Sequence, residues 1–242
     1  MLKSYKGRGI VLNTLKYGDS SVVVHLLTDV GGRQSFMVQG VRSGKGRGSK
    51  MALFQPLFGL EFEGITSSRG DMHRFREVQS GVTLERMPFD VRRSTIALFM
   101  AEVLYRLVNE REENRDLFEF AWGSLIALDT IEEGISNFHL WFLANLSRQL
   151  GFYPGNEHTH GAWFDIIEGS YAPSQPKHKL TLEPENAEFL RDFMECDIRH
   201  LGEIGMNRNQ RVSFLEGLIT YYSYHLDGIG SIKSIEVLRE VF

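Results

Sequence analysis

The stretch that decides the fold is GIVLNTLKYGDSSVVVHLLTDVGGRQSFMVQG, residues 9–40. Its three apolar runs are residues 9–15, 20–28 and 33–40. These runs are rich in Val, Ile, Leu and Thr, which favour strands. The turn signals Tyr17-Gly18-Asp19 and Thr28-Asp29-Val30-Gly31-Gly32 separate them. We therefore expect a meander of three antiparallel strands.

Two further runs, residues 57–63 and 72–78, alternate between apolar and polar positions. In the first run Phe58, Leu60 and Phe62 share one face, which is the period of a half-buried strand. Together with the first three runs, they make five short strands separated by Gly-rich turns. That number and spacing favour a small closed barrel.

From Pro88 onward the apolar residues recur with a helical period. The first stripe comprises Ile96, Phe99, Met100, Val103, Leu104 and Leu107; the second Leu117, Phe118, Ala121 and Leu125; and the third Ile135, Phe138, Phe142, Leu146 and Leu150. Gly151 and Pro154 are typical of a helix end. We expect an irregular insertion near residues 153–180, then helices at residues 184–195, 208–226 and 231–241. The pattern predicts a helical bundle.

The charges are divided unequally along the chain. The whole sequence of 242 residues has a net charge of −4. Residues 1–93 carry fifteen Lys and Arg against eight Asp and Glu, a net charge of +7, whereas residues 94–242 have a net charge of −11. Such asymmetry indicates an anionic partner for the basic part. With 42% hydrophobic and 24% charged residues, the composition excludes a disordered chain.

The strongest local signal is the basic segment, residues 41–50, directly after the third strand. Its cations are Arg42, Lys45, Arg47 and Lys50. Gly and Ser between these cations expose backbone N–H groups, so the segment suits contact with phosphates. It is not a nucleotide-binding P-loop, because Lys45 is followed by Gly46 and not by Ser or Thr. A solvated hairpin tip is the alternative interpretation.

Other cations and aromatic residues of the strands complete a predicted DNA-binding groove. Small barrels hold single strands in a positive groove that tracks the phosphates and offers aromatic faces to the bases. The predicted phosphate contacts outside the basic segment are Arg8, Lys16, Arg33, Arg69, Arg74 and Arg76, and the predicted stacking residues are Tyr17 and Phe36. Phe58 is expected in the core. The groove requires the arginines to converge on one face of the barrel.

Little else in the sequence indicates chemistry. His158 and His160 stand two residues apart without a further ligand at metal-site spacing, so we expect an exposed loop and no metal. Cys196 lies between two acidic residues, which favours an inert thiol. We predict no cofactor and no catalytic residue. A single cysteine, with no secretory or membrane-spanning segment, indicates a cytoplasmic protein.

Several short motifs follow one another along the chain. They are Gly9-Ile10-Val11-Leu12, Tyr17-Gly18-Asp19-Ser20, Leu26-Leu27-Thr28-Asp29-Val30-Gly31-Gly32, Gly40-Val41-Arg42, Leu53-Phe54-Gln55-Pro56-Leu57, Ala101-Glu102-Val103-Leu104, Leu117-Phe118, Leu150-Gly151-Phe152-Tyr153-Pro154 and Ile232-Lys233-Ser234-Ile235-Glu236-Val237-Leu238. In this order and spacing they resemble the RecO family of bacterial DNA repair and recombination mediators. The resemblance covers almost the whole chain except the insertion.

The resemblance implies an α+β protein of two domains, an N-terminal OB-fold barrel at residues 1–82 and an all-helical C-terminal domain at residues 83–242. It implies binding of single- and double-stranded DNA, annealing of complementary strands and, with RecR, help in loading RecA onto strands coated by single-stranded DNA-binding protein (SSB). Such a protein is expected to be associated with the nucleoid. Many relatives carry a four-cysteine zinc module after the Leu-Gly-Phe-x-Pro segment, but this chain has no cysteine there, so no zinc is expected.

The resemblance also implies contact between the helical domain and the acidic, hydrophobic C-terminal tail of SSB. Candidate contacts are Arg211, Lys233, Tyr221 and Tyr222, as cations for the carboxylates of the tail and aromatics for its apolar end. Two other functions stay open at this point. One is a protein adaptor without DNA affinity, and the other is an enzyme acting on nucleotides or phosphodiesters, suggested by the Gly-rich basic segment and eight histidines.

Overall fold

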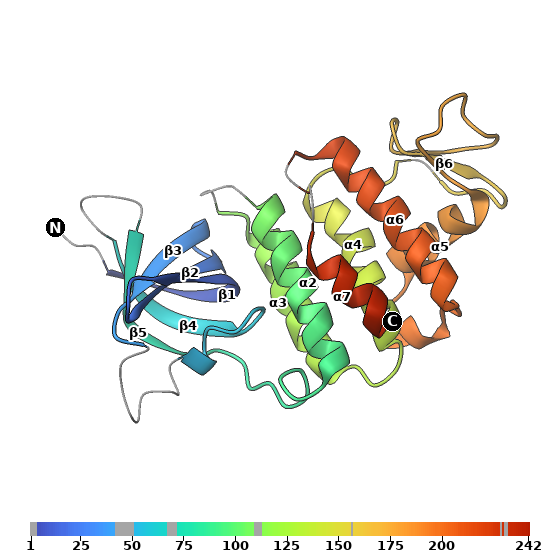
Figure 1. Ribbon diagram of the computed structural model, residues 1–242. Helices are drawn as coiled ribbons and strands as arrows, with labels where there is room; N and C mark the ends of the chain where they lie inside the picture. The colour runs from blue at the N-terminus through green and yellow to red at the C-terminus, as the bar shows by residue number, and fades with distance from the viewer. Residues whose placement is uncertain are drawn as a thin grey trace. The chain divides into compact units, whose positions relative to one another are not determined.

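The computed structural model describes residues 4–41, 51–66, 72–108, 113–155, 157–227, 229 and 232–242 (Figure 1). Its internal contacts divide the chain into two compact units, Met1–Asp129 and Thr130–Phe242. The division therefore falls at the end of the second long helix, which comprises residues 115–130. The change from strands to helices comes earlier, near residue 82. We describe each unit by itself.

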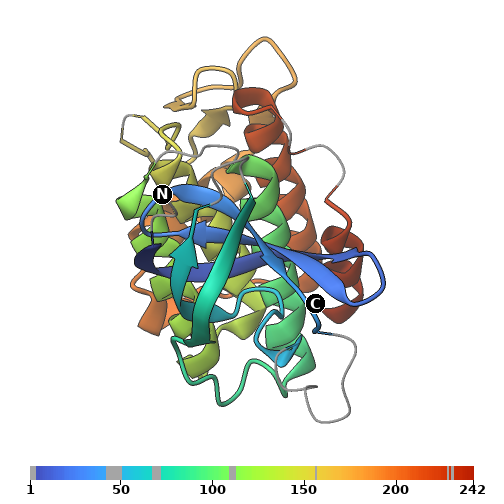
Figure 2. The ribbon, with the colours of Figure 1, turned by 90° about the vertical axis from the view of Figure 1, so that its left-hand side faces the viewer.

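The first unit begins with a closed five-stranded barrel (Figure 2). Its strands are β1 (Ser4–Tyr17), β2 (Ser21–Thr28), β3 (Gly32–Val38), β4 (Gly59–Ile65) and β5 (Met72–Ser80). The order around the barrel is β1-β2-β3-β5-β4, with β3 and β5 parallel and the other neighbours antiparallel. A five-stranded barrel of this kind is an OB-fold. The predicted fold class, a barrel followed by a helical region, is confirmed.

Alternating side chains of the strands fill the interior of the barrel. Val22, Val24 and Leu26 of β2 point inward, and Leu60 and Phe62 of β4 meet them there. Phe58, half-buried, packs against this core, as its alternation predicted. Side chains on alternate positions of a strand share a face, so the inward set makes one continuous apolar core.

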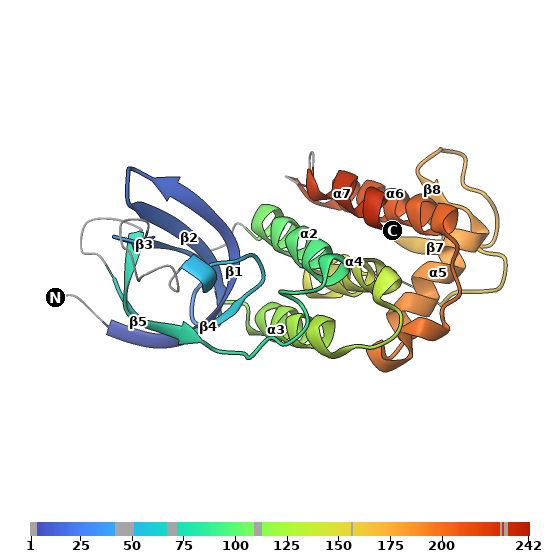
Figure 3. The same cartoon turned by 60° about the horizontal axis from the view of Figure 1, so that its bottom comes forward.

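Two helices, α2 (Val91–Leu107) and α3 (Arg115–Thr130), follow the barrel and lie side by side in Figures 1 and 3. Asp90 caps α2, because its carboxylate accepts hydrogen bonds from the backbone N–H groups of Arg92 and Arg93. Of the predicted stripe on α2, all but Leu107 are buried. All four predicted residues on α3 are buried as well. The helical periodicity was thus a reliable guide to the packed faces.

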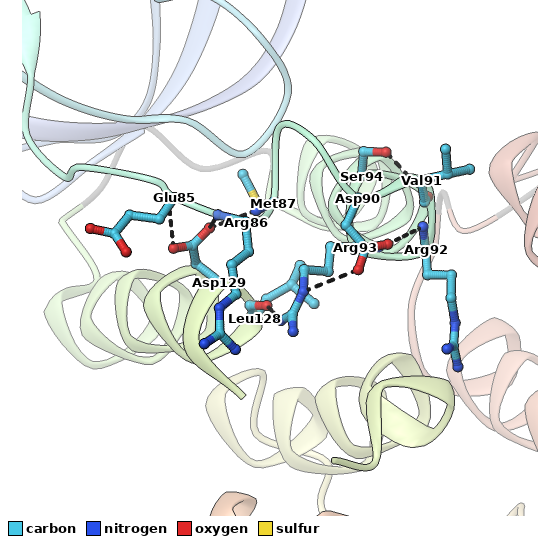
Figure 4. A network of polar contacts seen from close by, with 10 residues as sticks. All are labelled: Glu85, Arg86, Met87, Asp90, Val91, Arg92, Arg93, Ser94, Leu128 and Asp129. Carbon is cyan, nitrogen blue, oxygen red and sulfur yellow. Dashed lines mark hydrogen bonds and ion pairs between the residues drawn. The ribbon is translucent and has the colours of Figure 1, made fainter. Parts of the chain in front are cut away.

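The carboxylate of Asp129, at the end of α3, holds the chain segment that connects β5 to α2 (Figure 4). It accepts hydrogen bonds from the backbone N–H groups of Glu85 (2.9 Å), Arg86 (2.9 Å) and Met87 (2.7 Å). Burial alone would raise the pKa of Asp129, but the three backbone hydrogen bonds outweigh burial and lower it. Nearby, the buried Arg93 forms an ion pair with Asp90 at 3.4 Å.

The second unit consists mainly of helices (Figures 1 and 3). They are α4 (Phe138–Gln149), α5 (Pro184–Glu195), α6 (Arg208–His225) and α7 (Ser234–Val241), with short 3₁₀ helices η1 (Ile135–Asn137) and η2 (Ile198–Glu203). Helix α4 contacts both α5 and α6. Phe138, Phe142 and Leu146 of the predicted stripe are fully buried. The side chain of Asn207 caps α6, in a capping box with Gln210.

A small antiparallel sheet interrupts these helices. It consists of β6 (Trp163–Asp165), β7 (Ser170–Ala172) and β8 (Thr181–Leu182), in the order β7-β6-β8. The segment near residues 153–180 was predicted to be irregular. That prediction is wrong in part, because the segment contains β6 and β7. Strands of three residues are too short to show a period of two, so no periodic pattern marks them. Phe164 and Tyr171 are register partners that bury the inner face of this sheet.

Replacing Asp129 by Asn is expected to destabilise the first unit by about 2 kcal/mol, because hydrogen bonds to a carboxylate are stronger than those to an amide. The folded pKa of Asp129 lies below its ordinary value of 3.8, so its contribution is complete above that value and is lost as the pH falls through the folded pKa. The difference between wild type and Asp129→Asn should stay constant from pH 7 to about pH 4 and shrink as the pH falls further. Urea unfolding, followed by circular dichroism at each pH, measures this difference in unfolding free energy.

Asp19→Asn is the matched control, because Asp19 is exposed in the turn between β1 and β2. It makes the same chemical change and should leave the unfolding free energy unchanged. A difference for Asp129→Asn that does not vary with pH would contradict the role given to the carboxylate.

Candidate nucleic-acid interface

The turn between β1 and β2 presents two of the predicted DNA contacts to solvent. Gly18 adopts a left-handed conformation, with φ of 62°, which lets the chain reverse tightly. Lys16 and Tyr17, which precede it, are both exposed, and 58% of the Tyr17 surface is accessible. A cation and an aromatic ring therefore stand next to each other at one end of the barrel.

A backbone hydrogen bond places the start of the basic segment at this turn. The N–H of Val41 donates to the carbonyl of Ser20 at 3.0 Å. Arg42, which follows, begins the predicted run of cations. The other predicted contacts of this run, Lys45, Arg47 and Lys50, lie outside the described residues together with Arg42, and so does Arg69 of the segment between β4 and β5.

A hollow of about 920 Å³ opens in the barrel next to β5. The strands supply most of its lining: Lys6, Gly7 and Arg8 of β1; Met37 and Val38 of β3; Glu61, Phe62 and Glu63 of β4; and Arg74, Phe75, Arg76, Glu77, Val78 and Gln79 of β5. The rest of the lining comprises Asp29, Gln39 and Phe54, which lie outside the strands. Gln39 lies two residues before Val41. The hollow thus adjoins the chain that leads into the basic segment.

The described lining of the hollow is electrically balanced. Among these residues, the four cations Lys6, Arg8, Arg74 and Arg76 stand against four carboxylates, those of Asp29, Glu61, Glu63 and Glu77. Arg76 donates to Glu63 at 2.9 Å and Arg8 to Asp29 at 3.3 Å. Arg74 is exposed and has no ion-pair partner among the described residues. The lining is therefore not the uniformly positive groove that the sequence predicted.

Arg8, predicted to contact phosphate, forms internal contacts that hold α3. Its guanidinium lies 5.1 Å from the ring centre of Phe118 and 5.2 Å from that of Trp122. It also donates to Glu119, and this hydrogen bond raises the pKa of Arg8. The barrel and α3 are thus joined by one side chain that binds an aromatic pair and two carboxylates.

Arg33, another predicted phosphate contact, serves α2 in a similar way. Its Nη1 donates to the carbonyl of Tyr105 at 2.6 Å, and its guanidinium lies 5.0 Å from the centre of the Tyr105 ring. The predicted convergence is therefore wrong in part: Arg8, Arg74 and Arg76 border the hollow, whereas Arg33 lies against α2. Charge counting alone did not show which of the cations are already bound within the protein itself.

Phe36 was predicted to stack on bases, and the structure corrects this. It is 0% exposed and lies in the barrel core. Its ring is parallel to that of Phe75, with centres 4.3 Å apart. Phe75 is half-buried and borders the hollow, so it is the aromatic residue that sequence reasoning missed. The signal was its place between Arg74 and Arg76 in an alternating strand.

The candidate partner contacts in the second unit differ in exposure. Tyr221 and Tyr222 are 1% and 0% exposed, and their hydroxyls donate to the carbonyls of Phe152 and Leu143. Their predicted role at a surface is therefore wrong: a helix packed on two sides buries both. Arg211 is half-buried and donates to the carbonyl of Met206 at 2.6 Å, whereas Lys233 is exposed.

The two histidines of the insertion have separate partners. His160 pairs with Glu188 at 2.7 Å, and Nδ1 of His158 lies 3.3 Å from Nη1 of Arg191. Within the described residues, no three His, Cys, Asp or Glu side chains come together as metal ligands. Burial and the acidic neighbours raise the pKa of Cys196, as expected for an inert thiol.

Comparison with known proteins assigns the chain to a family. Residues 1–81 match the model of the N-terminal part of recombination protein O, and residues 88–234 match the model of its C-terminal part. The chain belongs to the RecO family. Proteins named DNA repair protein RecO from Bacteroides fragilis and Phocaeicola vulgatus are 39% and 37% identical to it, over 97% of each chain. That of Flavobacterium psychrophilum is 35% identical over 98% of each.

Membership of the RecO family makes the chain a DNA repair protein and not an enzyme, as predicted. Within the part of the chain that the structure describes, no helix has the length and apolar character needed to cross a membrane.

In this RecO family member, a cation bound within the protein, such as Arg8, and an exposed cation, such as Lys16, are expected to respond differently to substitution. Arg8→Gln should lower the unfolding free energy by about 1–2 kcal/mol, because it removes the cation–π contacts with the buried Phe118 and Trp122 and the ion pair with the half-buried Asp29. It should leave the salt dependence of DNA binding unchanged. Lys16→Gln should leave stability unchanged and reduce the salt slope by about 0.7 for single strands. Urea unfolding and fluorescence anisotropy across a salt series measure the two effects. An Arg8→Gln chain that stays folded and loses salt slope would show that Arg8 contacts phosphate.

Proposed function

We propose that this protein binds single- and double-stranded DNA and anneals complementary strands. With RecR, it then helps RecA load onto single strands coated by SSB. The hydrogen bond from Val41 to Ser20 carries the proposal, because it puts the start of the basic segment beside the exposed Lys16 and Tyr17. The OB-fold barrel and membership of a DNA repair family support it.

The excess of positive charge lies in a few short stretches of the sequence. Within the described part of residues 1–81, six Lys and Arg stand against five Asp and Glu, so this part is almost neutral. The remaining cations are Lys3, Arg42, Lys45, Arg47, Lys50 and Arg69. We infer that these residues and Lys16 supply most phosphate contacts.

Annealing follows physically from such contacts. Two strands repel each other through their phosphates, and a protein that neutralises phosphates releases the condensed counterions and lets the strands meet. Contacts to phosphate carry no sequence information, so the same segment serves any pair of complementary strands. Tyr17, exposed beside Lys16, offers a ring on which a base of either strand stacks.

The helical region has the charge of a protein-binding rather than a DNA-binding surface. Residues 94–242 have a net charge of −11, which repels DNA and leaves this part of the chain for partner proteins such as RecR. For the SSB tail, Lys233 and Arg211 remain the proposed cationic contacts, without the two buried tyrosines. We propose that the protein acts at the nucleoid, in the cytoplasm.

The decisive experiment compares single-stranded DNA binding by the intact chain and by a variant with Arg42, Lys45, Arg47 and Lys50 changed to Ala. We expect the slope of log affinity against log salt to fall by about 3 in magnitude, at about 0.7 per lost phosphate contact. The annealing rate of two complementary strands should fall in parallel. Fluorescence anisotropy and a strand-pairing assay measure these quantities.

A matched control removes four exposed cations elsewhere, with Lys177, Lys179, Arg115 and Arg199 changed to Ala. It should keep the original salt slope, although its net charge changes by the same amount. An unchanged slope in the first variant would remove the basic segment from the DNA contact. No binding by the intact chain at low salt, together with binding of RecR, would favour the adaptor function.

Lys233→Glu is expected to weaken binding of a peptide with the acidic, apolar sequence of an SSB tail by about tenfold, because it replaces attraction by repulsion. Glu236→Lys, one helical turn along α7, is the control of opposite sign and should strengthen binding. Isothermal titration measures both. Equal affinities for the two variants would place the tail elsewhere on the chain.

A further inference from the structure

A row of side chains crosses four strands of the barrel. Leu15 of β1 pairs in register with Val23 of β2. Met37 of β3 pairs with Val23 on one side and with Arg74 of β5 on the other. Register partners on neighbouring strands lie side by side on the same face of a sheet, so the four side chains form one continuous row.

This row lies on the outside of the barrel. Side chains alternate between the two faces of a strand. The residues next to members of the row on β2, β3 and β5 belong to the barrel core or pack against it; they are Val22, Val24, Phe36 and Phe75. Tyr17, two residues after Leu15, and its register partner Ser21 share the outward side. We call this surface the outer face; it comprises Leu15, Tyr17, Ser21, Val23, Met37 and Arg74.

Solvent reaches the outer face at both ends of the row. Leu15 is 46% exposed and Tyr17 is 58% exposed. Arg74 is exposed and Met37 is half-buried, whereas Val23, in the middle of the row, is buried. The outer face therefore presents an aliphatic and an aromatic side chain to solvent at one end and a guanidinium at the other.

Helix α2 lies against the adjoining part of the same sheet. The ring centre of His25, two residues along β2 from Val23, is 5.2 Å from that of Tyr105. Arg33 donates to the carbonyl of the same tyrosine. The helix thus covers the part of the sheet that is farther from the turn at Gly18, and leaves Leu15 and Tyr17 exposed.

The outer face differs in charge from the part of the barrel where β1 pairs with β4. There Lys6 is the register partner of Glu63 and Arg8 is that of Glu61, so cations stand beside carboxylates. The outer face, as defined by its residues, includes the cation Arg74 and no carboxylate. A polyanion therefore meets no repulsion from these side chains.

An apolar surface with a single cation suits unpaired bases better than a duplex. Single strands are held by aromatic and apolar side chains against which bases stack. In a duplex the bases are already stacked and paired, and proteins hold it mainly through its phosphates, which requires several cations. The composition of the outer face therefore favours the single strand.

We infer that the outer face binds unpaired bases and is the surface by which the protein distinguishes a single strand from a duplex. Bases pack on Tyr17, Leu15 and Met37, and Arg74 contacts a phosphate of the same strand. The inference rests on the proposed DNA-binding function and deepens it. The phosphate contacts proposed above serve both forms of DNA, whereas the outer face serves only a strand that lacks its complement. A strand leaves this face when it pairs, because pairing hides its bases.

The test measures binding of a single strand, oligo(dT), and of a duplex of equal length by fluorescence anisotropy. Leu15→Ser should lower the affinity for oligo(dT) by about threefold or more, because a base loses apolar surface that it would cover. Leu15→Trp should raise this affinity by about threefold or more, because it adds a ring for stacking. Both variants should bind the duplex as the intact chain does.

Val91→Ser and Val91→Trp are the matched controls, because Val91 is also apolar and is 71% exposed, at the start of α2. They should leave the affinity for both DNAs unchanged. Circular dichroism confirms that each variant is folded.

Arg74→Gln should reduce the magnitude of the salt slope for oligo(dT) by about 0.7 and leave the slope for the duplex unchanged. Lys177→Gln removes an exposed cation from another part of the chain and should change neither slope.

The outcomes separate this inference from the proposed function. If both Leu15 variants bind oligo(dT) like the intact chain, or change duplex binding by the same factor, the inference is overturned, while normal salt slopes leave the proposed function intact. Unchanged DNA binding by Leu15→Ser together with weaker binding of RecR would assign the outer face to a protein partner and also overturn it. No binding of either DNA by the intact chain at low salt would overturn both proposals.

Discussion

The double pairing of β1 is the constraint on which the first unit depends. Its first half pairs with β4 and its second half with β2, and the register shifts between Val11 and Asn13, near the point where the partner changes. At Gly9 both ladders overlap, and a Cβ there would lie 2.9 Å from the side chain of Leu26. Closure of the barrel between β2 and β4 and the place of the turn after Tyr17 both follow from this one bent strand.

Much of the fold could be predicted because period and turn chemistry are local properties. The alternation around Phe62 and the helical stripe through Phe99 describe faces that neighbouring residues share, and both are buried as expected. Phe36 was assigned to the wrong side because its run has no strict alternation. Tyr221 and Tyr222 were misread because adjacent residues of a helix point apart, and only a helix enclosed on two sides buries both.

The site was harder to predict than the fold because ion pairs join distant residues. Arg8 and Glu119 are separated by 111 positions, and no local sequence pattern indicates that the Arg8 guanidinium is bound to this carboxylate. The same limit applies to Arg33 and the carbonyl of Tyr105. The sequence shows the total charge of the region. The structure shows which of its cations are bound within the protein itself.

Asp129 has a mechanical consequence. Its carboxylate ties the last turn of α3 to the chain that leaves the barrel, while Arg8 and Arg33 tie the barrel to α3 and α2. Three separate anchors therefore join the barrel to two helices, in addition to the single covalent connection of the chain. A force that pulls the barrel away from α2 and α3 must break all three anchors as well as straighten the connecting chain.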